Sequence, residues 1–258
     1  MRLDLYLFQN LYTRSRQRAK ELIEGNKVKI DGHLISKPSW DIDEHSSHSV
    51  TIDDDCPYVS RGGLKLQAIL EGANIVVNNK ICLDIGASTG GFTHCLLLNG
   101  ASKVYAVDSG TNQLDSSLNN DFRVVSIEGY NARSISLNDI GEMVDIITID
   151  VSFISQTLIM PNALAILNSN GNYLSLIKPQ FEAGKNNIGK GGIVKDKKAR
   201  LLAVEKVIDC ARALSYKCNY FAKSPILGGD GNIEYIASFS KNGDEINSEY
   251  IKKIVLNT

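Results

Sequence analysis

The sequence predicts an α/β protein in which a doubly wound sheet follows a small N-terminal α+β domain. Apolar runs of strand length alternate with helical segments from residue 64 onward, which is the order of a doubly wound fold. A glycine-rich turn, 86–91, separates the first of these strands from the next helix, as in folds that bind nucleotides. Before residue 56, two short helices and several short strands instead predict a domain of their own.

The N-terminal domain is predicted over residues 1–55 and opens with two helices. Leu3, Leu5, Leu7 and Leu11 form an apolar helix. Ser15 is placed to cap an amphipathic helix that runs to residue 24. Gly25-Asn26 is expected to end that helix as a left-handed cap.

Short strands complete this domain. The pair Asp31-Gly32 between apolar segments 28–30 and 33–35 predicts a tight hairpin, and 50–52 predicts a last strand. Residues 56–63 are interpreted as a linker to a second domain over 64–258.

The second domain alternates strands and helices in the manner of a doubly wound sheet. The stretch 182–192, which contains Gly-Lys twice without a following Ser or Thr, is not a P-loop and is expected to be a flexible lid. Strands are predicted at 81–84, 103–107, 123–127, 145–150, 172–177, 218–222 and 235–239, and helices at 64–71, 91–99, 112–119, 155–167 and 196–214.

A nucleotide-type cofactor is predicted where the first two strands of this sheet end. The glycine-rich turn brings backbone N–H groups and a helix N-terminus against a ligand. Asp84 ends the first strand and is expected to fix a polar group, and Asp108 ends the second, where such folds bind ribose hydroxyls. The predicted cofactor residues are Asp84, Gly86, Ala87, Ser88, Thr89, Gly90, Gly91, Phe92, Asp108 and Asp150.

Four charged residues are predicted to converge at the same sheet edge. Asp150 and Lys178 each close a strand, and Glu234 precedes a strand whose start reaches that edge if it runs antiparallel. Lys65 lies in the helix that leads into the sheet. Each alone is as readily an ordinary strand-end charge, but the apolar run before Lys178 indicates a partly desolvated amine, and desolvation lowers a lysine pKa so that the amine can act as a base. Two flanking carboxylates would raise that pKa, so the role as a base requires burial to outweigh them.

Basic residues in the first 38 positions predict a nucleic-acid surface. This segment holds eight Lys/Arg and four acids, a net charge of +4, whereas the whole chain has a net charge of −1. A basic helix followed by a basic hairpin is typical of a surface that tracks phosphates, although a solvated helix face remains the alternative. The predicted RNA-binding residues are Arg2, Arg14, Arg16, Arg18, Lys20, Lys29, Lys37 and Arg61.

Composition excludes several other classes. Apolar residues make up 43% of the chain, enough for a packed core, yet no apolar run spans a bilayer. Five scattered cysteines without a Cys-x-x-Cys pair are typical of reduced, mostly buried thiols in a cytoplasmic protein. Four dispersed histidines argue against a metal site, and no pattern indicates an oligomeric state.

Two resemblances extend this interpretation. Arg2-Leu-Asp4, Val28-Lys-Ile30 and Lys37-Pro38 are among the residues that make 1–55 resemble an S4 RNA-binding domain. The whole chain resembles the TlyA family, an S4 domain fused to an FtsJ-like methyltransferase domain. The matching strings are 58–66, 84–93, 104–108, 150–155, 177–182, 189–194 and 231–235.

The TlyA resemblance implies a Rossmann-like class I fold and S-adenosylmethionine-dependent 2′-O-methylation of cytidines in ribosomal RNA, with ribosomal subunits as partners. It also implies that Lys65, Asp150, Lys178 and Glu234 form the catalytic tetrad. His94 and the segment 109–113 depart from the family pattern beside the cofactor turn. The family is also labelled haemolysin, so a membrane-lytic protein is one alternative. A catalytically inactive ribosome-binding factor and a nicotinamide-dependent dehydrogenase are the others.

Overall fold

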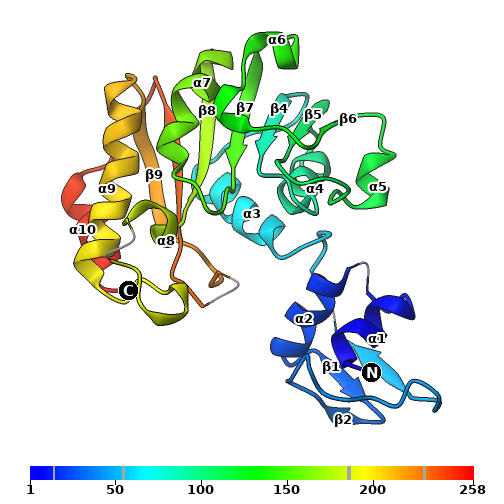
Figure 1. The fold of residues 1–258 in the computed structure, drawn as a ribbon. Helices are drawn as coiled ribbons and strands as arrows, with labels where there is room; N and C mark the ends of the chain where they lie inside the picture. Colours follow the sequence, from blue (N-terminus) through cyan, green and yellow to red (C-terminus); the bar gives the residue numbers. More distant parts are fainter. Residues whose placement is uncertain (14, 54–55, 185–186, 229–230) are drawn as a thin grey trace. The chain divides into compact units, whose positions relative to one another are not determined.

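The chain forms two compact units, Met1–Ser60 and Arg61–Thr258. The computed structural model describes residues 1–13, 15–53, 56–184, 187–228 and 231–258 (Figure 1). The division after Ser60 falls within the predicted linker 56–63. Each unit has its own hydrophobic core.

The N-terminal unit packs two helices against a three-stranded antiparallel sheet, as an α+β domain. Ser15 caps the second helix as predicted, because its side chain accepts a hydrogen bond from the Arg18 amide. One detail was wrong: Leu11 lies beyond the first helix and is exposed. The second helix ends at Gly25-Asn26 as predicted, with Asn26 as the left-handed residue at φ +58°. The elements are α1 (Leu3–Gln9), α2 (Arg16–Glu24), β1 (Val28–Ile30), β2 (His33–Leu34) and β3 (Val50–Ile52).

The C-terminal unit is built on a seven-stranded sheet in the order β6-β5-β4-β7-β8-β10-β9. The first five strands of that order are parallel, and β10 pairs antiparallel with both β8 and β9. This confirms the doubly wound α/β prediction, with a strand reversal at one side. The strands are β4 (Ile81–Ile85), β5 (Lys103–Val107), β6 (Val124–Ile127), β7 (Val144–Ile149), β8 (Leu167–Ile177), β9 (Lys217–Lys223) and β10 (Tyr235–Ser240).

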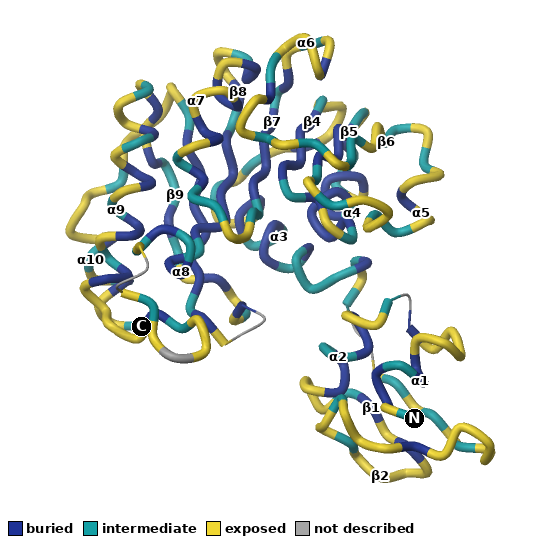
Figure 2. Tube along the Cα trace, in the orientation of Figure 1, coloured by how far each residue is buried: buried dark blue, intermediate teal, exposed yellow. Residues whose placement is uncertain are grey.

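Helices cover the sheet, and its central strands are buried along most of their length (Figure 2). The helices are α3 (Gly62–Gly72), α4 (Gly91–Leu98), α5 (Ser116–Asn119), α6 (Leu137–Ile140), α7 (Met160–Ile166), α8 (Pro179–Glu182), α9 (Lys197–Ala213) and α10 (Ser248–Leu256). The predicted helix 155–167 is in fact a 3₁₀ turn, Gln156–Leu158, followed by the shorter α7, and the predicted helix 112–119 begins only at Ser116. Three helices, α6, α8 and α10, were not predicted.

The cysteines agree with the reduced state that the sequence predicted. All five lie in described parts of the chain and none forms a disulfide; Cys82, Cys95 and Cys218 are buried. Within the predicted lid 182–192, Lys190–Gly192 forms a 3₁₀ turn, and residues 185–186 lie outside the described residues.

Candidate active site at the carboxyl edge of the sheet

The glycine-rich turn after β4 allows two backbone segments to approach closely. Gly86 has φ +84°, and a Cβ there would lie 2.3 Å from the Asp150 carbonyl oxygen, so only glycine fits. Gly90, at φ +94°, is the N-cap of α4. The turn therefore leaves the β4 edge open to a ligand, as the sequence predicted for a nucleotide-type site.

Asp84 does not face a ligand. Its side chain is fully buried, and its two oxygens accept hydrogen bonds from the hydroxyls of Thr93 at 2.7 Å and Thr148 at 2.8 Å. Burial raises the pKa of Asp84 to about 6, although the two hydroxyls favour the charged form. Asp84 was expected to touch the cofactor; in the structure its oxygens are engaged by the two hydroxyls and tie β4 to α4 and β7.

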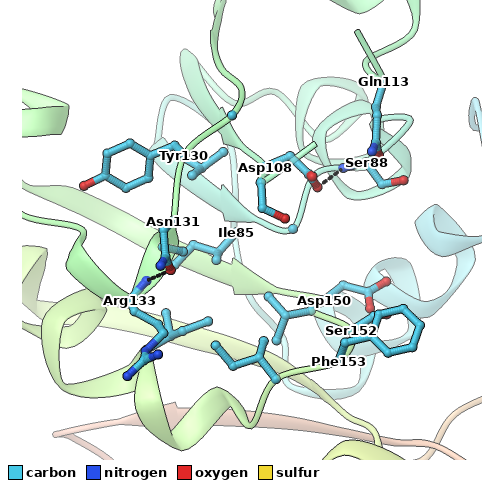
Figure 3. A pocket seen from close by; sticks show the side chains of 18 residues that line it. Ile85, Ser88, Asp108, Gln113, Tyr130, Asn131, Arg133, Asp150, Ser152 and Phe153 are labelled. Atoms are coloured by element: carbon cyan, nitrogen blue, oxygen red, sulfur yellow. Dashed lines mark hydrogen bonds between the residues drawn. The ribbon is translucent and has the colours of Figure 1, made fainter. Parts of the chain in front are cut away.

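Asp108 lies where predicted, at the end of β5 and beside the turn. It is half-buried, and its carboxylate accepts a hydrogen bond from the backbone amide of Ser88 at 2.8 Å (Figure 3) and another from that of Gly110 at 2.7 Å. The carboxylate thus joins the glycine-rich turn to the segment after β5. Each oxygen keeps a lone pair for a further donor such as a ribose hydroxyl.

A pocket of about 690 Å³ opens over these strand ends, a size that suits a small-molecule cofactor. It contains four of the predicted cofactor residues: Gly86, Ser88, Asp108 and Asp150. The other predicted residues do not line it: Asp84, Ala87, Thr89, Gly90, Gly91 and Phe92. Five of these six residues are buried and so do not reach the pocket surface: Asp84, Ala87, Gly90, Gly91 and Phe92.

Sequence reasoning missed the wall of the pocket that follows β6. Tyr130, Asn131 and Arg133 line it, with Gln113 from the segment after β5 (Figure 3). The available signal was that β6 is a third parallel strand, whose carboxyl end must reach the same edge. Two departures from the family pattern were noted, His94 and the segment 109–113. The segment borders the pocket through Ser109 and Gln113, whereas His94 does not line it.

The first tetrad pair is a buried ion pair between α3 and the start of β10. Lys65 Nζ lies 2.6 Å from Glu234 Oε2, and the two side chains are 10% and 3% exposed. Gln180 Nε2 approaches the other Glu234 oxygen at 3.5 Å. A lysine and a glutamate that are this buried fix each other's position.

The second pair lies directly beside the first. Lys178 Nζ is 2.5 Å from Asp150 Oδ1 and donates to Ser152 Oγ at 3.1 Å. Tyr235 is opposite Ile177 in the antiparallel ladder, so Glu234 and Lys178 are the next facing positions. The antiparallel β10 thus brings all four predicted residues to one edge.

The sequence left open whether burial or the flanking carboxylates set the pKa of Lys178. Burial does lower it, but the nearby carboxylates of Asp150 and Glu234 outweigh burial, and the pKa of Lys178 is raised above its ordinary value. The amine is therefore protonated at neutral pH until another charge enters the site.

An exposed aromatic ring lies next to this edge. Phe153 is 93% exposed and adopts φ +62°, a left-handed conformation that costs a bulky residue strain. Its ring centroid is 5.1 Å from that of Phe181, and it lines the pocket with Ser152 (Figure 3). This conformation leaves an apolar ring exposed to solvent beside the pocket.

The predicted RNA-binding residues divide by exposure. Lys29 and Lys37 are exposed and Lys20 and Arg61 half-buried, whereas Arg18 is buried and paired with Glu21, so it faces the interior. Arg14 lies outside the described residues. Arg2 and Arg16 are about half exposed, at 46% and 49%, and both contact the buried Asp4.

Two other kinds of site are absent from the described ranges. No helix there is both long and apolar enough to cross a membrane. Nor do the described His, Cys, Asp and Glu residues include a group of three or more that is suited to a metal ion.

Comparison with family models matches both units. Residues 58–241 match the FtsJ-like methyltransferase model, and residues 1–46 match the S4 domain. These matches confirm the resemblance of residues 1–55 to an S4 domain and of the whole chain to an S4 domain fused to an FtsJ-like methyltransferase.

Relatives are similar over nearly the whole chain. Hemolysin A of Brachyspira hyodysenteriae is 45% identical over 93% of this chain and 99% of its own. The Mycobacterium tuberculosis 16S/23S rRNA (cytidine-2'-O)-methyltransferase TlyA is 42% identical over 91% of this chain and 87% of its own. A solved structure from Streptococcus thermophilus, described as a hemolysin, has 38% identity and a TM-score of 0.80, covering 100% of this chain and 94% of that one.

Proposed function

Because the chain belongs to the TlyA family of FtsJ-like methyltransferases, we propose that it transfers a methyl group from S-adenosylmethionine to a cytidine ribose 2′-hydroxyl in ribosomal RNA. The observation that carries the proposal is the meeting of the Lys65–Glu234 and Lys178–Asp150 pairs beside the pocket. Asp150 belongs to both the tetrad and the pocket, so a reacting hydroxyl and a bound cofactor would meet there.

The residues present fit such a cofactor. The Gly86 backbone, which no Cβ obstructs, and the Asp108 carboxylate would hold the polar parts, and Tyr130 and Asn131 would border its ring system. S-adenosylmethionine supplies an electrophilic methyl group on a positively charged sulfonium. A positive charge near Asp150 competes with Lys178 for that carboxylate and lowers the pKa of the lysine.

Lys178 is the proposed base that takes the proton of the 2′-hydroxyl, since its amine lies at the strand end where the pocket and the tetrad meet. Lys65 and Glu234 would orient the ribose and hold Lys178 in place. Alignment of oxygen, carbon and sulfur supplies much of the remaining rate. Phe153 offers a ring on which an unpaired nucleobase would stack.

The alternatives have less support. Lysis of membranes is suggested only by the names of relatives such as Hemolysin A, and no described helix would span a bilayer. An inactive binding factor would not need the intact tetrad. A dehydrogenase leaves the S4 unit unexplained. Action on ribosomal RNA would place the protein in the cytoplasm.

The proposed function is tested by incubating purified protein with labelled S-adenosylmethionine and bacterial ribosomal subunits from cells that lack such an enzyme. We expect 2′-O-methylcytidine at a defined rRNA position, detected by mass spectrometry of nuclease digests. Lys178→Ala is the matched control and should leave the position unmodified. Label on protein, on a base nitrogen or on no product would contradict the proposal.

A further inference from the structure

A buried carboxylate in the N-terminal unit holds two of the arginines on its surface. Asp4 in α1 is fully buried, and its oxygens receive four hydrogen bonds. Arg2 donates through Nε to Oδ1 at 2.9 Å and through a terminal nitrogen to Oδ2 at 3.1 Å. Arg16 Nε donates to Oδ2 at 2.9 Å, and the Leu5 amide donates to Oδ1 at 3.1 Å. Four donors match the lone-pair capacity of one carboxylate.

This arrangement joins two consecutive helices, α1 and α2. Arg2 immediately precedes α1, and Arg16 is the first residue of α2, which packs beside α1 (Figure 1). Burial raises the pKa of Asp4, but the two guanidinium groups more than offset it and hold the pKa below its usual value. The carboxylate therefore stays charged and keeps both arginines attached.

The guanidinium groups keep donors that are not used on Asp4. Arg16 contacts Asp4 through Nε alone, so its two terminal nitrogens are not engaged with the carboxylate. Both arginine side chains remain about half exposed. A guanidinium held along one edge can present its remaining N–H groups to a phosphate with little further loss of side-chain entropy.

We propose that Asp4 is a positioning residue that presents Arg2 and Arg16 as one rigid pair to the phosphate backbone of the RNA substrate. The inference rests on the proposed function, because it assumes that ribosomal RNA is the ligand of the N-terminal unit. It differs from the general expectation of a basic surface, in which an acid among arginines only weakens attraction to phosphate.

The two interpretations predict opposite signs for Asp4→Asn. If Asp4 merely neutralises positive charge, its removal tightens binding to RNA. If it positions the arginines, removal frees both side chains and weakens binding roughly tenfold, since each must then be ordered on binding. Glu24→Gln is the matched control: it removes one exposed acid on α2 and changes the net charge equally. It should bind RNA no more weakly than the wild type.

Binding of purified bacterial ribosomal subunits to the full chain is measured at several salt concentrations, with urea unfolding in parallel. In a chain that carries Arg2→Ala and Arg16→Ala, Asp4→Asn should no longer alter RNA affinity. It should instead raise stability there, because the unpaired buried carboxylate is removed. A purely structural role would give the same Asp4→Asn effect in both backgrounds.

A second variant keeps Asp4 paired. Arg16→Lys retains the charge, but an ammonium directed at Asp4 cannot also offer a fork to phosphate, so we expect weaker binding. Unchanged affinity in Arg16→Lys, or unchanged or tighter binding in a folded Asp4→Asn variant, would overturn the inference while the proposed function stands. A wild-type chain that does not bind ribosomal subunits would overturn both.

Discussion

Two carboxylates of the same sheet edge, Asp84 and Asp150, have different surroundings and therefore different roles. Asp84 is enclosed among hydroxyls and apolar groups, whereas Asp150 is partly exposed and paired with Lys178. Both lie at the carboxyl ends of neighbouring parallel strands, β4 and β7. The first stabilises the scaffold beneath the turn, and the second controls the charge of the proposed base.

Lys178→Ala should fold and bind S-adenosylmethionine, because the residue lies at a strand end, yet methyl transfer should fall by about 10²–10⁴-fold. Lys178→Arg should not restore the rate, since a guanidinium stays protonated. Because the pKa of Lys178 is raised, the wild-type rate should climb with pH above neutrality and that dependence should vanish in the variants. Single-turnover rates across pH test this, and a fast Lys178→Arg enzyme would show that only positive charge is needed.

Asp84 should make stability depend on pH. Its pKa is about 6 in the folded chain and about 3.9 when unfolded, so the folded state binds the extra proton between these values. Stability should therefore decline as pH rises from about 4 to 6, by an amount of order 3 kcal/mol. Asp84→Asn should be more stable than the wild type at pH 7, with the gap closing below pH 6. Urea unfolding at several pH values measures it, and a variant less stable at pH 7 would refute the assignment.

At the scale of elements, one carboxylate after β6 shapes the segment between β5 and α5. Glu128 accepts hydrogen bonds from the amides of Asn112 at 2.6 Å, Gln113 at 2.9 Å and Leu114 at 3.2 Å. These bonds lower the pKa of Glu128, so the carboxylate remains charged at neutral pH. The segment places Gln113 in the pocket.

Glu128→Gln should therefore weaken S-adenosylmethionine binding by a few-fold and leave the maximal rate unchanged. The glutamine side chain has one accepting oxygen in place of two, and its NH₂ group would face a backbone N–H donor. Calorimetry and saturation kinetics separate the two effects. Asp115→Asn, on the neighbouring cap of α5, is a control that should bind normally. Equal affinities of Glu128→Gln and wild type would mean that the segment is held by its other contacts.

The hairpin of the N-terminal unit should weaken as pH rises. His48 contacts Asp31 Oδ2 at 2.8 Å and the Asp43 carbonyl at 2.9 Å, and because both partners only accept, the protonated ring satisfies both. Its pKa is raised by Asp31, so this stabilisation is present below the unfolded pKa and lost as pH rises through the folded one. Hydrogen exchange of the hairpin amides should accelerate across that window in wild type and not in His48→Gln, once corrected for intrinsic exchange; parallel profiles would contradict it.

Elements with strong local signals were predictable from the sequence, and those held by distant partners were not. The strands at 103–107 and 81–85 are apolar runs with polar ends, and Ser15 is a cap with a local donor. The enclosure of Asp84 by Thr148 depends on a residue far away in the chain. The wall after β6 was missed because its residues form no motif, and the raised pKa of Lys178 results from a balance of distances.

At the scale of the whole molecule, the proposed function assigns RNA attachment to the first unit and methyl transfer to the second. The S4 match ends at residue 46, and the FtsJ-like match begins at residue 58, just before the division after Ser60. The pocket and all four tetrad residues belong to the second unit. Cofactor binding should then survive the loss of the first unit, provided that residues 56–60 are kept with the second.

A chain of residues 56–258 should therefore fold and bind S-adenosylmethionine as the full protein does, in the micromolar range, roughly −8 kcal/mol. It should methylate ribosomal subunits only at much higher subunit concentration, because phosphate-binding side chains such as Arg2, Arg16, Lys29 and Lys37 are gone. The salt dependence of subunit binding should become shallower by about one unit for each phosphate-binding residue that is removed. Calorimetry with the cofactor and methylation kinetics at several salt concentrations test both halves. Full activity of the truncated chain at low subunit concentration would place RNA recognition in the catalytic unit, and Lys195 and Lys198, both exposed near the start of α9, would be the first residues to substitute.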